Sequence, residues 1–302
     1  PSHFFGFFTS VNSDIIKDLH LYKGGMPARY GGRLSSVIDI LPRDGSSEEF
    51  SGKAGISPIA THLLVDVPVV REKMSLLLAA RTTYSNWIMD LVDYPLLNKS
   101  RASFYDLNSR LTWTPDKKNT IELSGYHSLD AFRLNNDTTY RYVNTIGSLK
   151  WTRSLAAGSK LSLAASASLY DYNIGSTVVA EKAFNLGYGI HYSGLKAEID
   201  IPAGEVHHLD GGIESGLYDV MPGSFRPAGG SSLVTPKEIG RERALENALF
   251  LEDRMTISES FSASLGIRYS IFSAIGPATV KLYEEGLPMS SATLTDTLLF
   301  GQ

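Results

Sequence analysis

The sequence predicts an all-β protein built from long antiparallel strands that form a transmembrane barrel of the up-and-down kind. From residue 45 onward, apolar and polar side chains alternate with a period of two. Several of these runs exceed the five or six residues usual in soluble strands. The connections between the runs are alternately short and long, which is the pattern of outer-membrane barrels with tight periplasmic turns and longer extracellular loops.

The alternation is clear in the run 121–130. Ile121, Leu123 and Leu129 fall on one face, and Glu122 and Ser124 fall on the other. The same reading along the chain predicts about eleven strands. The predicted strands span residues 48–57, 61–69, 73–85, 104–114, 119–131, 142–154, 159–174, 182–201, 206–218, 243–257 and 260–273.

The connections alternate in length along the chain. The short turns fall at residues 71–73, 115–119, 156–159, 202–205 and 258–260. The longer polar connections fall around residues 86–103, 133–141, 176–182 and 219–243. A soluble β-sandwich has no physical reason to keep this order, so the connections favour the membrane barrel.

Aromatic residues lie near the predicted strand ends, where a barrel meets the membrane interfaces. Trp113 and Trp151 lie beside short turns. Tyr126, Tyr170, Tyr172 and Tyr269 lie toward the long connections. Amphipathic rings favour the headgroup level, so these positions predict two aromatic girdles.

Composition excludes several classes of protein. The 302 residues carry a formal net charge of −4 and no basic cluster with interleaved aromatic residues, which argues against a nucleic-acid partner. The absence of cysteine excludes disulfides and thiol chemistry. No apolar run approaches the roughly 18 residues of a transmembrane helix. With neither a signal peptide nor an initiator methionine, the sequence is expected to be cut from inside a larger protein.

Catalytic and metal-binding motifs are also missing. The sequence contains no HExxH, G-x-S-x-G or P-loop motif and no cysteine nucleophile. His207 and His208 are adjacent, so in a strand they point to opposite faces and cannot grip one metal ion together. Residues 44–48 lack the ligand spacing of a calcium loop. We therefore expect neither an enzyme nor a bound metal or cofactor.

The stretch 15–40, IIKDLHLYKGGMPARYGGRLSSVIDI, predicts a compact strand–turn–strand unit. Gly pairs flank a turn at residues 27–30, and the unit displays Arg29 and Arg33. Its "KG…YG…G.I.I" pattern resembles the end of the plug domain of TonB-dependent outer-membrane receptors. RTTY (81–84), FYDLN (104–108) and GIRYS (266–270) resemble barrel segments of the same family.

The resemblance implies a fold and a function. Residues 1–44 would be the end of a small α/β plug, and residues 45–302 the first half of a barrel of about twenty-two strands. The family imports scarce nutrients (siderophore-iron, vitamins, glycans or peptides) across the outer membrane of Gram-negative bacteria. The TonB–ExbB–ExbD complex supplies the energy, through an N-terminal part of the plug that these residues lack. The resemblance leaves a surface lipoprotein partner open.

Charged residues on the polar faces are expected to point into the lumen and meet the plug. They are Arg110, Lys150, Glu122, Glu246, Glu252 and Arg268. A buried arginine is tolerated when a carboxylate pairs with it. The family pairs plug arginines with barrel glutamates, so we expect Arg29 or Arg33 to pair with Glu246 or Glu252.

Nutrient contacts are expected at the outer strand ends and in two of the long connections. The candidates are Tyr84, Trp87, Tyr94, Tyr105, Phe132, Arg133, Tyr140 and Arg141. Aromatic and arginine surfaces suit siderophore, sugar or peptide ligands equally. The segment 87–94 also reads as a short amphipathic helix.

Two other classes of protein stay open. A passive porin or a structural or adhesive barrel would lack a plug, so the stretch 15–40 argues against it. A soluble β-rich carbohydrate-binding protein or carbohydrate-active enzyme would not need alternating short and long connections or outward rows of leucine, alanine and isoleucine.

Overall fold

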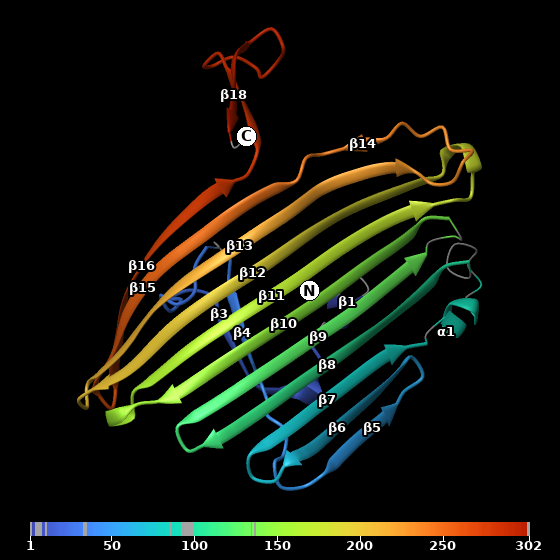
Figure 1. Cartoon of the computed structure of the whole chain (residues 1–302). Coiled ribbons are helices and arrows are strands. Elements are labelled where there is room, and N and C mark those ends of the chain that lie inside the picture. The colour runs from blue at the N-terminus through green and yellow to red at the C-terminus, as the bar shows by residue number, and fades with distance from the viewer. Residues whose placement is uncertain are drawn as a thin grey trace.

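One large antiparallel sheet dominates the computed structural model, which describes residues 2–3, 8–9, 11–32, 35–84, 86–91, 93, 99–133, 135 and 137–300 (Figure 1). Its strands follow one another across the sheet in chain order, as in an up-and-down barrel wall. The strands are β5 (Ser51–Ile56), β6 (Ala60–Val70), β7 (Met74–Thr83), β8 (Arg101–Asp116), β9 (Asn119–Arg133), β10 (Thr139–Ser154), β11 (Lys160–Ser176), β12 (Phe184–Ala203), β13 (His207–Pro227), β15 (Glu242–Ser258) and β16 (Phe261–Ile275). The short β14 (Lys237–Glu238) pairs with β13 beside this path.

The observed strands follow the predicted ones closely and confirm the all-β class. The main difference is in β13, which continues to Pro227, whereas its predicted end was residue 218. β12 and β13 stay paired into the long connection, with Asn185 opposite Arg226, after a register shift between Gly187 and Gly189. At 20 and 21 residues, these strands are about twice as long as a membrane crossing needs.

The described part of residues 2–42, which we call the N-terminal segment, lies against one face of the sheet. It contains β1 (Ser2–His3), β2 (Phe8–Thr9), the 3-10 turn η2 (Ser13–Ile15), β3 (Ile16–Tyr22) and β4 (Val37–Pro42). The strands β3 and β4 pair antiparallel, and Figure 1 shows them behind the curved sheet. We call the sheet the wall, residues 43–50 the linker, and residues 28–32 between β3 and β4 the tip.

The wall has a polar inner face and an apolar outer face. Asp106, Asp210 and Glu252 point toward the N-terminal segment and are buried. On the opposite face, Leu195 and Leu265 remain 65% and 72% exposed. This is the reverse of a soluble sheet, which packs its apolar face into a core. One small apolar cluster, Leu64, Leu77 and Ala79, packs against Ile15 of the N-terminal segment.

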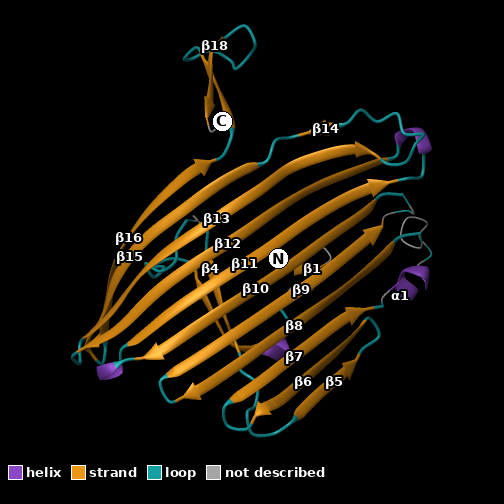
Figure 2. Ribbon diagram, in the orientation of Figure 1, coloured by secondary structure: helices purple, strands orange, loops and turns teal. Residues whose placement is uncertain are grey.

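Helices are few and short (Figure 2). The helix α1 (Asn86–Leu91) occupies the long connection in which a helix over 87–94 was predicted. No helix among the described residues is long and apolar enough to cross a membrane.

The part of the chain after β16 contains two strands that the eleven predicted strands do not include. The strands β17 (Ala278–Tyr283) and β18 (Leu294–Phe300) form a separate two-stranded hairpin that projects beyond the wall (Figure 1). These strands are short, at 6 and 7 residues, and lie beyond the last predicted strand, which ends at residue 273.

Candidate functional site

The candidate site is the polar interface between the N-terminal segment and the inner face of the wall. At the linker, the Arg43 guanidinium lies 3.1 Å from the Asp66 carboxylate of β6, and the Ser46 backbone N–H donates to the same carboxylate at 2.5 Å. Asp66 is 2% exposed. Beside it, Lys53 of β5 pairs with Asp14 at 2.5 Å. The linker is therefore bound to β6 by a half-buried guanidinium and a backbone N–H that share one buried carboxylate.

Asp44 makes a second linker contact. It accepts hydrogen bonds from the Arg110 guanidinium (2.8 Å) and the Thr112 hydroxyl (2.7 Å) of β8. Burial alone would raise the pKa of Asp44, but these hydrogen bonds and the charge of Arg110 hold it below its usual value. Arg110 also pairs with Glu122 of β9. Arg110 and Glu122, which were predicted to point into the lumen, thus form one hydrogen-bonded network with Asp44 of the linker.

The tip contacts β15 and β16 through its backbone. The Ala28 N–H donates to the Glu252 carboxylate at 2.6 Å, and the Arg268 guanidinium donates to the Arg29 carbonyl at 3.3 Å. A β-carbon on Gly31 would collide with the Arg268 side chain, and one on Gly32 would lie 2.5 Å from Glu246 Oε1. The second glycine pair therefore lets the tip approach the wall more closely than other residues could.

For Arg29, the predicted pairing is wrong in its partner, while the pairing offered for Arg33 stays a prediction. The ion pair of Arg29 is with Asp210 of β13, at 3.9 Å, and not with Glu246 or Glu252. Glu252 is engaged by the Ala28 N–H and the Ser264 hydroxyl, and Glu246 accepts from the Tyr218 hydroxyl. Sequence reasoning could not choose among inward carboxylates on neighbouring strands. Arg33 lies outside the described residues.

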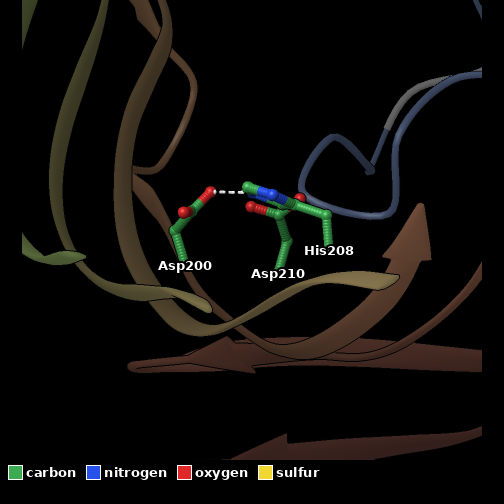
Figure 3. A group of neighbouring side chains, drawn as sticks. All are labelled: Asp200, His208 and Asp210. Carbon is green, nitrogen blue, oxygen red and sulfur yellow. Dashed lines mark hydrogen bonds and ion pairs between the residues drawn. The ribbon is translucent and has the colours of Figure 1, made fainter. Parts of the chain in front are cut away.

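Asp200, His208 and Asp210 gather on the inner face of the wall (Figure 3). Asp210 is also the ion-pair partner of Arg29. His208 Nε2 lies 2.6 Å from Asp200 Oδ2, and Arg254 Nη2 lies 2.5 Å from Asp210 Oδ2. His207 points to the opposite face, toward Asp253, as the adjacent-histidine argument predicted. Ligand atoms of a metal site are present, but the guanidinium of Arg254 already balances the carboxylate charge. The group fits a salt-bridge network better than a cation site.

A third buried contact involves His3, which the sequence analysis did not single out. His3 Nδ1 lies 2.7 Å from Asp130 Oδ2 of β9, and His3 Nε2 lies 3.5 Å from Asp106 Oδ2 of β8. Arg81 of β7 pairs with Asp106 at 2.7 Å and donates to the Thr9 carbonyl. Both carboxylates alternate onto the polar face, so their inward direction was readable from the sequence, whereas their partner was not.

The predicted nutrient contacts separate into three groups. Phe132 and Tyr140 share the inner face, with ring centroids 6.2 Å apart. Tyr105 and Arg141 alternate onto the outer face, where the Tyr105 hydroxyl lies 3.3 Å from His127 Nε2.

The remaining predicted contacts lie at the loop end of the wall. The Trp87 indole N–H donates to the Pro58 carbonyl, and the Tyr84 hydroxyl donates to the Ser57 carbonyl. Arg133 is exposed at the end of β9. Tyr94 lies outside the described residues.

Tyrosines predicted for the outer girdle lie instead on the inner face. Cross-strand partners share a face, and Tyr142 is opposite Asp130, which contacts His3. Tyr142 is also opposite Tyr172, which is opposite Tyr188. The first pair is stacked at 4.4 Å and the second meets edge-on at 4.7 Å.

This inner surface, which we call the tyrosine wall, extends beyond these three rings. Its members share the inner face of β9 to β13 toward the long connections. They are Phe132, Tyr140, Tyr142, Tyr170, Tyr172, Tyr188, Tyr192 and Tyr218. Tyr126 of β9 also lies on the inner face, at the cavity lined by Ile40 and Pro42 of the N-terminal segment. The girdle prediction was therefore wrong for Tyr126, Tyr170 and Tyr172.

Comparison with solved structures identifies the fold. The chain aligns with the copper transporter OprC at a TM-score of 0.68 and 12% identity, over 97% of this chain and 47% of that one. It aligns with the ferripyoverdine receptor of the outer membrane of Pseudomonas aeruginosa at 0.66 and 12%, over 87% and 43%. For the siderophore receptor PirA from Acinetobacter baumannii the values are 0.64 and 14%, over 92% and 47%. This is the fold of TonB-dependent outer-membrane receptors.

The solved neighbours are longer than this chain, which spans about half the length of the structures it matches. No family model matches the sequence, and no curated protein matches it. These neighbours are described as a copper transporter and as siderophore receptors of the outer membrane, and none is described as an enzyme.

Proposed function

We propose that this chain is part of a TonB-energised outer-membrane receptor that imports a scarce nutrient through a plugged barrel. Residues 1–44 would be the end of the plug, and residues 45–302 the first half of the barrel. One observation carries the proposal. A Gly-rich segment is docked by polar contacts inside a wall whose opposite face is apolar.

This arrangement suits a plug that must rearrange. Hydrogen bonds and ion pairs at a partly wet interface exchange with water at modest cost, unlike a dry apolar seam. A passive porin needs no such segment in its lumen. The energy would come from the TonB–ExbB–ExbD complex acting on the plug, and the site of action would be the outer membrane of a Gram-negative bacterium.

The nutrient would enter from the extracellular end of the barrel and contact the tyrosine wall on the inner face. Phe132 and Tyr140 begin this surface beside the long connection around 134–138, and Tyr142 and Tyr172 continue it. Tyrosine offers a rigid ring and a hydroxyl donor, which suits ligands that stack and accept hydrogen bonds. Siderophore-iron is favoured as the first probe, because solved neighbours include siderophore receptors.

Uptake of radiolabelled ferric siderophores by the source bacterium tests the proposal. We expect deletion of the full-length gene, or addition of a protonophore to the wild type, to abolish uptake. Gene-dependent uptake that ignores the protonophore would indicate a passive pore and contradict the energised mechanism. If iron uptake is unchanged, the same comparison is repeated with labelled glycans, vitamins and peptides to find the imported nutrient. If deletion of the gene reduces uptake of none of these nutrients, the proposal that the protein is an importer is overturned.

A further inference from the structure

The wall contacts the N-terminal segment at the tip and at the linker. The two contacts differ in which polar partners the wall side chains keep when the segment leaves. At the tip, four charged wall side chains each keep a partner within the wall. Glu252 keeps the Ser264 hydroxyl (2.6 Å) and Arg268 keeps Glu214 (3.1 Å). Asp210 keeps Arg254 (2.5 Å) and Glu246 keeps the Tyr218 hydroxyl (3.1 Å). Departure of the tip therefore leaves none of these four groups without a polar partner.

The linker contact at Asp66 is different. Among the described residues, the polar partners of Asp66 are the Arg43 guanidinium and the Ser46 N–H, and both belong to the linker. Asp66 is 2% exposed while the linker covers it. Departure of the linker would remove both partners of this carboxylate together, including its one counter-charge among the described residues, and leave only water to replace them.

Neighbouring contacts strengthen the linker further. The Glu72 N–H of the β6–β7 turn donates to the Ser47 carbonyl at 2.9 Å, and Ile15 packs against the apolar cluster of the wall. Beyond these contacts, a cavity of about 250 Å³ lies between Ile40 and Pro42 on one side and Tyr126 and Ile146 on the other. The segment is thus tightly bound at the linker and loosely packed at Ile40 and Pro42, which precede it in the chain.

We infer that the segment moves about a pivot at residues 43–46. The linker stays on β6 while the tip swings away from β13, β15 and β16, so that a path opens along Glu214, Glu252 and Arg268. The gate is partial, and the plug is not expelled as one body. This inference rests on the proposed role of the segment as a plug, but its test needs no transport.

Amide hydrogen exchange of the full-length receptor in membranes, measured over a urea series, tests the pivot. The two amides to compare both donate to wall carboxylates: Ala28 to Glu252 and Ser46 to Asp66. We expect the Ala28 amide to exchange at least about tenfold faster than the Ser46 amide. Equal rates with the same urea dependence would show a single opening unit and overturn the pivot, as would faster exchange at Ser46.

Two matched substitutions sharpen the result. Asp66→Asn and Asp210→Asn each neutralise one wall carboxylate that faces the segment. The first is expected to raise exchange across 43–50 by about tenfold or more, and the second to leave it within about twofold. Equal effects of the two variants on the linker would contradict the pivot.

A cross-link supplies a second measurement if Asp66→Asn fails to fold. A β-carbon at Gly266 would lie 2.8 Å from Ala28 Cβ, and the 302 residues contain no cysteine. The oxidised A28C/G266C pair should slow exchange at the tip and leave exchange at the linker unchanged, with the reduced pair as control. Slowing of both would show that they open together, and slowing of neither would show that the tip does not open; either result overturns the pivot. Failure of the pivot leaves the importer proposal standing, because uptake tests that proposal separately.

Discussion

His3 Nδ1 lies 2.7 Å from Asp130 Oδ2, although 127 positions separate the two residues in the chain. The imidazole is 1% exposed and stacks on Phe104 with ring centroids 4.2 Å apart. Burial acts to lower the pKa of His3, but hydrogen bonds to Asp106 and Asp130 and their charges outweigh it, and the net shift is upward. Arg81 faces the same carboxylate group and competes for Asp106.

This contact predicts a pH dependence of docking at the N-terminal end. A histidine whose folded pKa is raised adds stability below its unfolded pKa of about 6.5, and that stability is lost as the pH rises through the folded value. We expect protease cleavage near the N-terminal end of the segment to accelerate as the pH is raised from about 6 to about 9. His3→Gln should dock weakly at every pH, and an unchanged slope in that variant would contradict the assignment.

Asp44 should show the opposite pH dependence at the linker. Its pKa is lowered, so its contribution is present above the unfolded value and is lost as the pH falls. Because its side chain is 49% exposed, Asp44→Asn is expected to reduce the stability of the docked linker by less than about 1 kcal/mol at neutral pH.

Urea titration of the linker amides measures this effect. Asp18→Asn is the control, since the Asp18 side chain is 54% exposed and, among the described residues, its polar contacts are with His20 and Leu19 of the N-terminal segment. A larger loss in the control would contradict the role of Arg110.

Gly266 should matter for the approach of the tip. A β-carbon there would lie 2.8 Å from Ala28 Cβ, so Gly266→Ala must push the tip from β16. We expect protection of the Ala28 amide to fall about threefold to tenfold, with the strand itself still formed. Gly147→Ala is the matched control, because no atom lies within 4 Å of its added β-carbon. Equal effects of the two substitutions would show that strand flexibility, and not the contact between residue 266 and Ala28, controls protection of the Ala28 amide.

The tyrosine wall predicts a difference between two tyrosines in nutrient binding. Tyr172→Ala removes a ring from the inner face, whereas Tyr105→Ala removes one from the outer face. For the nutrient found in the uptake assay, we expect Tyr172→Ala to weaken binding about tenfold, or about 1.4 kcal/mol, and Tyr105→Ala to leave it unchanged. Calorimetric titration of each purified variant with the nutrient measures its affinity. Weaker binding by Tyr105→Ala than by Tyr172→Ala would show that the ligand does not bind at the tyrosine wall.

The outer face predicts the response to a charge. Leu195 is 65% exposed in the middle of β12, and Leu233 is 80% exposed in the connection after β13. Leu195→Arg should destabilise the barrel in lipid by about 2–4 kcal/mol, whereas Leu233→Arg should leave stability nearly unchanged. Folding of the full-length receptor into vesicles over a urea series measures both, and equal stability of the two variants would show that Leu195 does not face lipid.

Much of the wall could be predicted from the sequence because each strand pairs with its neighbours in the chain. The period of two in residues 121–130 indicated which side of β9 is polar and placed Glu122 inward, and the same period in β8 placed Arg110 inward. Short turns fixed which strands are adjacent. These are local constraints, and a single sequence carries them.

The girdle prediction failed for a physical reason. Tyr170 shares its face with Ser166 and Ser168, so strict alternation places it inward, although its position near a strand end is also typical of a girdle residue. Tyrosine suits both a membrane interface and a polar lumen, and residue type alone does not separate the two environments.

The sequence by itself determined the strands, their order and which face of each strand is polar, because alternation and turn length act between near neighbours. The tertiary structure alone decided that Arg29 meets Asp210 rather than Glu252, and that the linker binds Asp66. Several inward carboxylates offered the tip the same chemistry. The choice among them depends on how the tip lies across three wall strands, which no local pattern encodes.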